Sequence, residues 1–538
     1  MNMKLSYEGL KEQEGWKGAG VALPEYDWKT MKERTMESPV WVHFGAGNIF
    51  RGFIAGLQQR LLNQQLADRG IVAAETFDYD IIDKIYRPHD SMTLMVSLKP
   101  DGSTQKEVIA SIAEGIKADS SDSQQWTALK NVFENPSLQM ASFTITEKGY
   151  AIRDIQGNLM KVVEEDMEQG PAKARHAMSV VAALMYARYL AGAAPIALVS
   201  MDNCSHNGEK LKSSVLAMVK AWRERELVPG EFEAYMEDEA RVSFPWSMID
   251  KITPRPAEII EKQLSEAGIE DMAPVITSRN TYIAPFVNAE IPQYLVVEDR
   301  FPNGRPSLEK AGVYMTTRDT VNMTERMKVT TCLNPLHTAL AVYGCLLGYT
   351  SIAQEMEDAQ LKRLVERIGY DEGMPVVTDP GILSPMDFIH EVIDQRLPNP
   401  FIPDTPQRIA TDTSQKVAIR FGETIKSYMA SDSLDVKNLT CIPLALAGWL
   451  RYLLGVDDRG EAMAVSADPM LTRLQQQLAG VKAGEPDSYK GQLKEILCNP
   501  AVFGVNLYEA GLAEKVEGMF REMLAGPGAV RAELKKYV

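Results

Sequence analysis

Short apolar runs alternate with amphipathic segments through the first 300 or so residues of the chain. Runs at residues 40–44 and 70–74 flank a glycine turn and a helical pattern, which is the outline of a strand–helix–strand unit. Further runs at 140–146, 195–201 and 294–297 predict more buried strands separated by helices. This alternation predicts an α/β fold with a mostly parallel, doubly wound sheet.

After about residue 318 the strand pattern fades and amphipathic helical segments take over. They lie at 352–368, 386–395, 413–429, 439–454, 470–479 and 508–525. The sequence therefore predicts two domains. A Rossmann-like domain covers residues 1–318 and includes a polar N-terminal arm at 1–38. A mainly α-helical domain follows at 319–538.

Composition narrows the possible partners. The formal net charge of -16 and the pI near 5.1 argue against nucleic acid or an anionic membrane, because both attract basic surfaces. The five cysteines are scattered and form no CxxC pair, which favours reduced thiols. The N-terminus lacks the apolar stretch of a secretory signal. We expect a cytoplasmic enzyme of small molecules, either a monomer or a homodimer.

The segment TERMKVTTCLNPLHTALAVYGCLLGY, residues 324–349, concentrates candidate catalytic groups: Glu325, Lys328, Asn334 and His337. A lysine acts as a general base near neutral pH when its surroundings lower its pKa from about 10.4 to roughly 7–8. An amide and an imidazole can hold the reacting oxygen. Asn334 is expected to cap a helix that starts at Pro335. The alternative is a capped core helix whose histidine is only hydrogen-bonded.

The turn Gly45-Ala46-Gly47 lies where a Rossmann fold brings backbone close to a pyrophosphate. The next glycine, Gly52, comes too late for the usual fingerprint. An acid after the second strand, Glu75 or its neighbour Asp78, would accept ribose hydroxyls and repel a 2′-phosphate. The pattern therefore favours NAD over NADP, with Gly45, Gly47, Asn48, Phe50, Arg51, Glu75 and Asp78 as candidate cofactor-binding residues.

Three polar segments supply further candidates. Residues 202–208 follow a buried strand, and they indicate either a ligand site at the sheet edge or an ordinary Asx turn. A metal held by Cys204 and His206 would need ligands that no nearby spacing supplies, so no metal is expected. The other two segments, 244–255 and 399–416, hold Asp250, Arg255, Arg408 and Lys416, and are either loops with solvated charges or a site for a polyhydroxylated acid.

Taken together, these segments resemble the polyol-specific long-chain dehydrogenase family, which includes mannitol 2-dehydrogenase and the hexuronate reductases. The matching pieces occur in the family's order between about residues 40 and 415: HFGAGNIFRGF, TITEKGY, SMDNCSHNG, FPWSMIDKITP, VVEDRFPNGRP, ERMK with LNPLH, and PDTPQRIATD. The resemblance implies an NAD-linked dehydrogenase of a sugar acid or a polyol.

The resemblance also implies roles for individual residues. Lys328 is the expected catalytic lysine, Asn203 and Asn334 the amides that stabilise an alkoxide, and His337 the imidazole on the substrate oxygen. Asp250 and Arg408 match substrate-binding positions, beside which Lys416 and Arg255 are candidates. Glu325 and Glu147 are candidates for a proton relay or for supporting contacts.

Two departures from the family stand out. KVTTCLN has five residues between the lysine and the asparagine where the family has four, and on one α-helix this would rotate Lys328 by about 100°. We expect the helix to restart at Asn334-Pro335 and leave the extra residue in the link. Phe50 also replaces the family's usual histidine before Arg51.

The long N-terminal arm and the CLNPLHTALAVYGCLLGY segment are most similar to the mannonate-oxidising branch of the family. We therefore expect interconversion of fructuronate and mannonate. Mannitol 2-dehydrogenase and tagaturonate reductase activities are the alternatives. Two hypotheses from other classes are an NAD- and metal-dependent sugar hydrolase using Cys204 and His206, and a catalytically silent sugar sensor.

Overall fold

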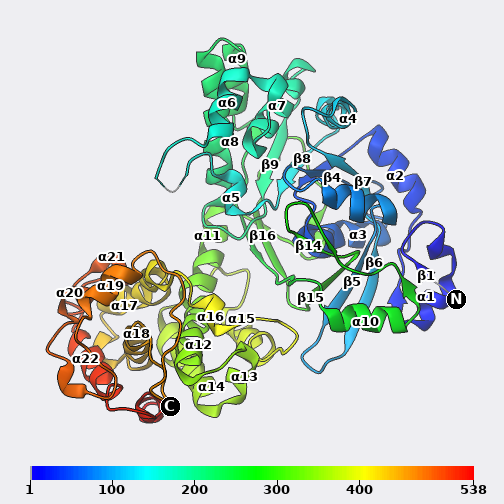
Figure 1. Ribbon diagram of the computed structural model, residues 1–538. Coiled ribbons are helices and arrows are strands. Elements are labelled where there is room, and N and C mark those ends of the chain that lie inside the picture. Colours follow the sequence, from blue (N-terminus) through cyan, green and yellow to red (C-terminus); the bar gives the residue numbers. More distant parts are fainter. Residues whose placement is uncertain (1–2, 155) are drawn as a thin grey trace. The chain divides into compact units, whose positions relative to one another are not determined.

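The computed structural model describes residues 3–154 and 156–538, and the chain folds into two compact units (Figure 1). One unit extends to Asn322 and the other begins at Met323. The division falls inside helix α11 (Arg318–Met327), whereas the sequence prediction placed it just before residue 319.

The first unit is built on a six-stranded parallel sheet with the order β10-β9-β8-β3-β4-β7. Its strands, in chain order, are β3 (Trp41–Phe44), β4 (Ile71–Glu75), β7 (Ile112–Lys117), β8 (Met140–Phe143), β9 (Ile196–Ser200) and β10 (Val242–Ser243). The strand order reverses between β3 and β8. In doubly wound sheets this reversal opens a ligand crevice at the carboxyl ends of the strands.

Helices cover both faces of this sheet, as the alternating side chains of β3 require. Val42 and Phe44 join a core that includes Leu129, Val181 and Trp222, whereas Trp41 faces the opposite core. The helices of the first unit are α1 (Gln13–Gly18), α2 (Trp28–Glu37), α3 (Ala55–Asn63), α4 (Ser123–Glu134), α5 (Thr146–Tyr150), α6 (Lys161–Gln169), α7 (Ala177–Leu190), α8 (Asn207–Glu224), α9 (Gly230–Glu237) and α10 (Glu258–Glu266). The predicted Rossmann-like fold is confirmed.

Smaller sheets complete the unit. β5 (Thr93–Leu98), β6 (Thr104–Ile109), β15 (Phe286–Glu290) and β2 (Val21–Ala22) form one, and β11 (Ser247–Asp250), β16 (Tyr294–Glu298) and β17 (Tyr314–Thr316) form another. The pairs β1 (Met3–Lys4) with β12 (Ile269–Glu270) and β13 (Val275–Ile276) with β14 (Tyr282–Ile283) are the shortest. The predicted strand at 294–297 is β16. It does not extend the main sheet, because it pairs antiparallel with β11.

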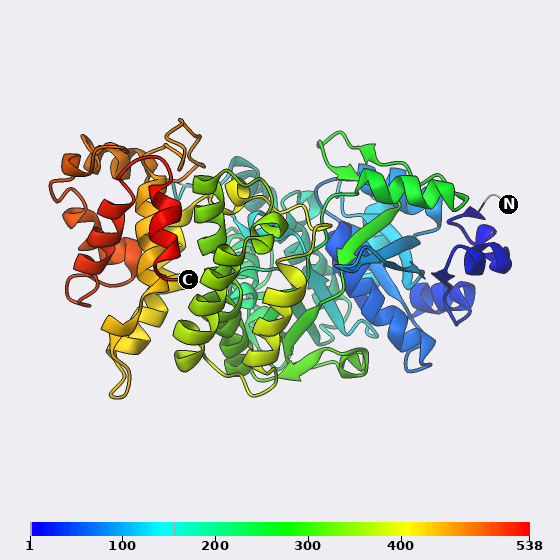
Figure 2. The ribbon, with the colours of Figure 1, turned by 90° about the horizontal axis from the view of Figure 1, so that it is seen from below.

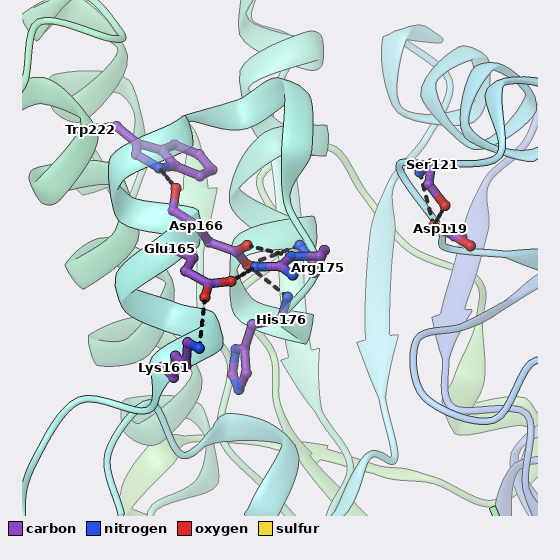
Figure 3. A network of polar contacts seen from close by, with 8 residues as sticks. All are labelled: Asp119, Ser121, Lys161, Glu165, Asp166, Arg175, His176 and Trp222. Atoms are coloured by element: carbon purple, nitrogen blue, oxygen red, sulfur yellow. Dashed lines mark hydrogen bonds and ion pairs between the residues drawn. The ribbon is translucent and has the colours of Figure 1, made fainter.

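A carboxylate on α6 fixes the connection to α7 (Figure 3). Asp166 Oδ2 accepts hydrogen bonds from the backbone N–H groups of Arg175 and His176, at 2.9 and 2.8 Å. The carbonyl of Asp166 accepts from the Trp222 indole at 2.8 Å. One buried residue thus joins α6, the start of α7 and α8. This network stabilises the helical layer and lies on different segments from the predicted site residues.

The second unit is helical, as predicted. Its α-helices are α12 (Asn334–Leu347), α13 (Ile352–Glu357), α14 (Ala359–Glu366), α15 (Pro385–Glu391), α16 (Pro406–Ile409), α17 (Glu423–Met429), α18 (Cys441–Tyr452), α19 (Leu471–Gln477), α20 (Lys494–Leu497), α21 (Pro500–Phe503), α22 (Ala513–Glu522) and α23 (Ala529–Lys535). π-helical turns extend several of them, including η7 (Lys328–Cys332), η10 (Val392–Arg396) and η12 (Ala418–Gly422).

Helices α12 and α18 lie side by side in both ribbon views, yellow-green against orange (Figures 1 and 2). Both are almost entirely buried. Their approach is close because the Tyr343 ring lies over Gly448, and the Tyr343 hydroxyl donates to the carbonyl of Leu444 at 2.9 Å. The described part of the chain contains no helix that is long and apolar enough to cross a membrane.

The close contact between α12 and α18 leads to a stability prediction. A Cβ at Gly448 would lie 2.9 Å from the Tyr343 ring, so Gly448→Ala must displace a buried, hydrogen-bonded side chain. We expect a loss of about 1–3 kcal/mol in the free energy of unfolding, measured by urea denaturation. The matched control is Gly518→Ala in α22, where the Cβ would meet nothing within 4 Å. It should gain up to about 1 kcal/mol from helix propensity, and equal effects of the two changes would contradict the packing argument.

Candidate functional site

The predicted residues divide between the two units. The first unit contains the cofactor candidates together with Glu147, Asn203, Asp250 and Arg255. The second unit contains Glu325, Lys328, Asn334, His337, Arg408 and Lys416.

The glycine turn after β3 has a backbone that only glycine adopts readily. Gly45 has φ +103°, and a Cβ there would lie 2.2 Å from the carbonyl oxygen of Thr144. A Cβ on Gly47 would meet nothing within 4 Å, so one side of the turn is open. The chain becomes helical at Asn48, continues through a π-helical turn, η2 (Phe50–Ile54), and then enters α3. The turn therefore offers backbone N–H groups and a helix N-terminus at the switch point of the sheet.

The central peptide of the turn is held from two sides. Glu75 Oε2 accepts from the Ala46 N–H at 2.8 Å, and the Tyr86 hydroxyl donates to the Ala46 carbonyl at 3.1 Å. Glu75 Oε1 also accepts from the backbone N–H groups of Phe77 and Asp78. Burial raises the pKa of Glu75. The contacts of Glu75 are thus with the protein backbone, and the ribose role predicted for it stays a prediction.

Asp78 is also drawn into the protein. It is buried, and its Oδ2 accepts from the Thr277 hydroxyl at 2.6 Å, which ties the loop after β4 to the β13–β14 hairpin. The neighbouring Phe77 is 62% exposed, and the Arg279 guanidinium lies 5.0 Å from the centre of its ring. An exposed aromatic ring beside the second strand of a Rossmann fold is a candidate surface for a nucleobase. The sequence analysis missed it, although an aromatic residue two positions after Glu75 was a usable signal.

Two of the cofactor candidates are buried. Phe50 is fully buried and stacks on His43, with ring centroids 4.1 Å apart. Arg51 is 1% exposed, and it donates to the carbonyl of Ala284 at 2.9 Å and to Asn48 Oδ1 at 2.8 Å. Burial lowers the pKa of Arg51 to about 10. Both side chains therefore support the turn from inside the protein, and their predicted cofactor contacts stay predictions.

At the carboxyl end of β9, Asp202 fastens two of the predicted motifs together. Its carboxylate accepts from the N–H groups of Ile145 and Thr146, at 2.9 and 3.0 Å, and from the Tyr150 hydroxyl at 2.6 Å. Thr146 has φ +62°, a strained value for a β-branched residue. Burial raises the pKa of Asp202. This bonding fixes the backbone immediately before Asn203, which is exposed at the sheet edge.

The segment after Asn203 packs on the third motif. A Cβ on Gly208 would lie 2.4 Å from the Trp246 ring, and the His206 ring centre lies 4.6 Å from that of Trp246. β11 then carries Asp250, which is 7% exposed, while Arg255 is exposed. Glu147 lies at the surface and pairs with Lys210. In the described part of the chain, no group of three or more His, Cys, Asp or Glu residues is arranged to hold a metal ion.

In the second unit, Lys328 opens a π-helical turn, η7, and its side chain is buried. The Leu333 N–H donates to the Lys328 carbonyl, five residues back, at 3.1 Å. A π turn closes over one more residue than an α turn, so the extra residue of KVTTCLN is taken up there. The prediction of a helix restart is right in outline and wrong in one detail: Leu333 occupies the N-cap, and Asn334 is the first helical residue. Glu325 lies one turn before Lys328, on α11.

The side chain of His337, in the first turn of α12, is 19% exposed and places Nε2 at 3.1 Å from Asp404 Oδ2. Asp404 also pairs with Arg408. Lys416 donates to the carbonyls of Ile409, at 3.2 Å, and Thr411. Burial lowers the pKa of His337 to about 3, assisted by four nearby cations: Arg420, Arg408, Arg396 and Lys416.

The imidazole of His337 is therefore neutral near pH 7. A neutral ring that faces a carboxylate through Nε2 must carry its proton there, which leaves Nδ1 as an acceptor. The structure thus brings His337, Arg408 and Lys416, which the sequence analysis took from two separate segments, into one basic cluster. Asp404 lies in the 399–416 segment that the sequence analysis singled out, four residues before Arg408. The sequence analysis missed Arg420, because nothing in the sequence marked it.

Comparison with known proteins covers almost the whole chain. Residues 40–310 match the family model of the mannitol dehydrogenase Rossmann domain, and residues 320–524 match that of the mannitol dehydrogenase C-terminal domain. A D-mannonate oxidoreductase from Thermotoga maritima is 54% identical over 538 residues, which is 100% of this chain and 99% of the relative. A D-mannonate oxidoreductase from Escherichia coli is 27% identical, covering 85% of this chain and 87% of its own.

Two solved structures are similar over nearly their full lengths. A substrate-free D-sorbitol dehydrogenase has a TM-score of 0.78 at 26% identity, covering 96% of this chain and 98% of its own. The mannitol 2-dehydrogenase of Pseudomonas fluorescens, solved as a ternary complex with NAD and D-mannitol, has a TM-score of 0.70 at 25% identity and covers 99% of both chains.

The lowered pKa of His337 predicts how stability depends on pH. Its folded-state pKa of about 3 lies below the ordinary value of 6.5, so between these values the unfolded state binds a proton that the folded state does not. The free energy of unfolding should therefore fall as the pH drops below about 6.5, by up to about 1.4 kcal/mol per pH unit from this group.

Urea unfolding of the wild type and His337→Asn between pH 8 and pH 4 measures this contribution. The variant should lose less stability per pH unit than the wild type. Comparison at pH 8, where the imidazole is neutral in both states, isolates the packing cost of the substitution. Parallel curves for the two proteins would show that His337 is not held neutral.

Proposed function

The chain belongs to the mannitol dehydrogenase family of oxidoreductases, and on that premise we propose that it interconverts D-fructuronate and D-mannonate with NAD as the cofactor. A relative of 54% identity, aligned over the whole chain, is named D-mannonate oxidoreductase, which supports this choice. The expectation of a cytoplasmic monomer or homodimer stays a prediction.

The observation that carries the choice of substrate is the basic cluster around His337. Mannonate differs from mannitol in having a carboxylate in place of a terminal hydroxymethyl group. Four cations lower the pKa of His337: Arg396, Arg408, Lys416 and Arg420. Asp404 pairs with Arg408. A neutral polyol cannot neutralise this concentration of positive charge. A carboxylate can, because guanidinium groups bind it with paired hydrogen bonds.

The first unit suits a dinucleotide. Gly45 and Gly47 let the backbone approach a pyrophosphate, the open space beside Gly47 leaves room for it, and Glu75 with Tyr86 keeps the Ala46 peptide in place. NAD, when bound, supplies the hydride acceptor for alcohol oxidation and, as NADH, the hydride for reduction. Acidic groups at Glu75 and Asp78 would disfavour a 2′-phosphate.

The proton chemistry is assigned to the second unit. Lys328 takes the hydroxyl proton during oxidation and returns it to the ketone oxygen during reduction. His337, neutral and with Nε2–H donated to Asp404, offers Nδ1 to the substrate hydroxyl. The amide of Asn334 donates to the developing alkoxide, a contribution of about 3 kcal/mol for an effective donor. The alkoxide contact expected for Asn203, which belongs to the first unit, stays a prediction. Glu325, one helical turn before Lys328, is assigned to proton exchange with solvent.

The activity is tested by following NADH absorbance with purified protein and fructuronate, tagaturonate or fructose, each with and without a chelator. We expect turnover of fructuronate, with NADH preferred to NADPH and no effect of the chelator. Turnover of fructose alone would transfer the assignment to mannitol 2-dehydrogenase, and of tagaturonate alone to a tagaturonate reductase. Metal-dependent activity without net change in NADH would favour the hydrolase.

The role of Lys328 is tested by Lys328→Ala. Loss of a general acid–base group should reduce kcat by roughly 10²–10⁴-fold, with NADH affinity, measured by fluorescence titration, unchanged. Lys482→Ala, which removes an exposed lysine paired with Glu485, is the matched control and should retain full activity. Full turnover by the Lys328 variant would refute the assignment.

A further inference from the structure

Arg420 lies on the π-helical turn η12, which packs against η7 and against α12. Its Nη1 donates to the Thr338 hydroxyl at 2.5 Å. Thr338 directly follows His337, and its hydroxyl donates to the carbonyl of Asn334 at 2.9 Å. Arg420 is thus attached to the same helical turn that carries the two α12 residues assigned to the substrate oxygen.

Among the described residues, no acid balances the charge of Arg420. In the described part of the chain no carboxylate forms an ion pair with its guanidinium, and its one hydrogen bond is to the neutral Thr338 hydroxyl. The neighbouring Arg408, in contrast, pairs with Asp404. Burial lowers the pKa of Arg420 to about 10, and no acidic group opposes this effect.

The Arg420 side chain is half-buried, and a guanidinium that is partly removed from water without a counter-charge carries a cost for the folded protein. The guanidinium of Arg420 has five N–H donors, and one of them is bonded to the Thr338 hydroxyl. Most of the hydrogen-bonding capacity of Arg420 is therefore available to a ligand. A carboxylate supplies both missing elements, because it neutralises the charge and accepts two parallel N–H bonds. A hydroxymethyl group supplies neither.

We propose that Arg420 binds the carboxylate of the sugar acid and thereby sets the preference for an acid over a neutral ketose. This inference rests on the proposed function, since it names the residue that recognises the acid group of that substrate. Arg420 is assigned to specificity, and the proton transfer remains with Lys328.

The test compares the wild type with Arg420→Met and Arg420→Lys. For Arg420→Met, kcat/KM for fructuronate should fall roughly 10²–10³-fold, mainly through KM, while kcat/KM for fructose stays the same or rises. Arg420→Lys keeps the charge but not the paired geometry and should fall about 10-fold. Arg459→Met, which removes an exposed arginine paired with Asp457, is the matched control. An unchanged ratio of fructuronate to fructose efficiency in both Arg420 variants would overturn the proposal.

A second variant separates carboxylate binding from a structural role. If Arg420 acts only by holding the Thr338 hydroxyl, Thr338→Val should reproduce the effect of Arg420→Met on the substrate ratio. If Arg420 binds the carboxylate, Thr338→Val should keep the preference for fructuronate. Reproduction of the loss by Thr338→Val would overturn the proposal.

Thermal unfolding with D-mannonate or D-mannitol, in the presence of NAD, makes the outcome independent of turnover. Mannonate should raise the Tm of the wild type more than mannitol does, and Arg420→Met should abolish that difference. A wild type that turns over no keto-uronate would refute the proposed function, but an Arg420-dependent shift with mannonate would still uphold the carboxylate site. No shift with mannonate, or an equal shift in the Arg420 variant, would refute the site.

Discussion

The placement of Lys328 relative to Asn334 and His337 depends on one backbone constraint, the π-helical turn at Lys328–Cys332. An α-helix advances about 100° per residue, so a single insertion between Lys328 and Asn334 would turn one away from the other. The five-residue hydrogen bond from Leu333 to Lys328 takes up that residue and lets α12 begin at Asn334. Arg420 lies on a second π turn, η12, packed against the first. Such turns are tolerated when the surrounding packing supports them, and they are common at functional sites.

The first unit solves a comparable problem at its glycine turn. A backbone that must stay open to a pyrophosphate cannot be held by side chains on its exposed side, so it is held from within: Glu75 and Tyr86 bind the two ends of the Ala46 peptide. The buried Arg51 then orders Asn48 at the start of the helix. A similar arrangement is found after β9, where the Asp202 carboxylate accepts a hydrogen bond from the N–H of the strained Thr146 and the next residue, Asn203, is exposed. In each place a buried polar group fixes a backbone segment whose outer face remains available.

The sequence predicted those features that local patterns encode. Apolar runs located β3, β4, β8 and β9, and helical periodicity located most helices of the second unit. Strands such as β15 escaped because they pair with segments far away in the chain: Phe286 lies opposite Leu94. The sequence analysis did not predict that Phe50 and Arg51 are buried, because they lie in a π-helical turn that no local sequence pattern indicates. Arg420 was missed for another reason. One arginine in an amphipathic segment normally faces solvent, and the partial burial of Arg420 depends on how η12 packs against η7 and α12.

The basic cluster links substrate charge to the protonation of His337. Without a ligand, burial and Arg420, with three further cations, hold the pKa of the imidazole near 3, so Nδ1 remains an acceptor. A carboxylate bound at Arg420 would offset part of that positive charge and move the pKa of His337 upward, toward its ordinary value. Because the pKa of His337 starts from about 3, far below 7, a partial rise would leave the imidazole neutral at pH 7. The cluster can therefore bind an anion strongly while the His337 ring stays neutral and accepts a hydrogen bond from the substrate hydroxyl. A histidine of ordinary pKa beside a bound carboxylate would not combine these two properties.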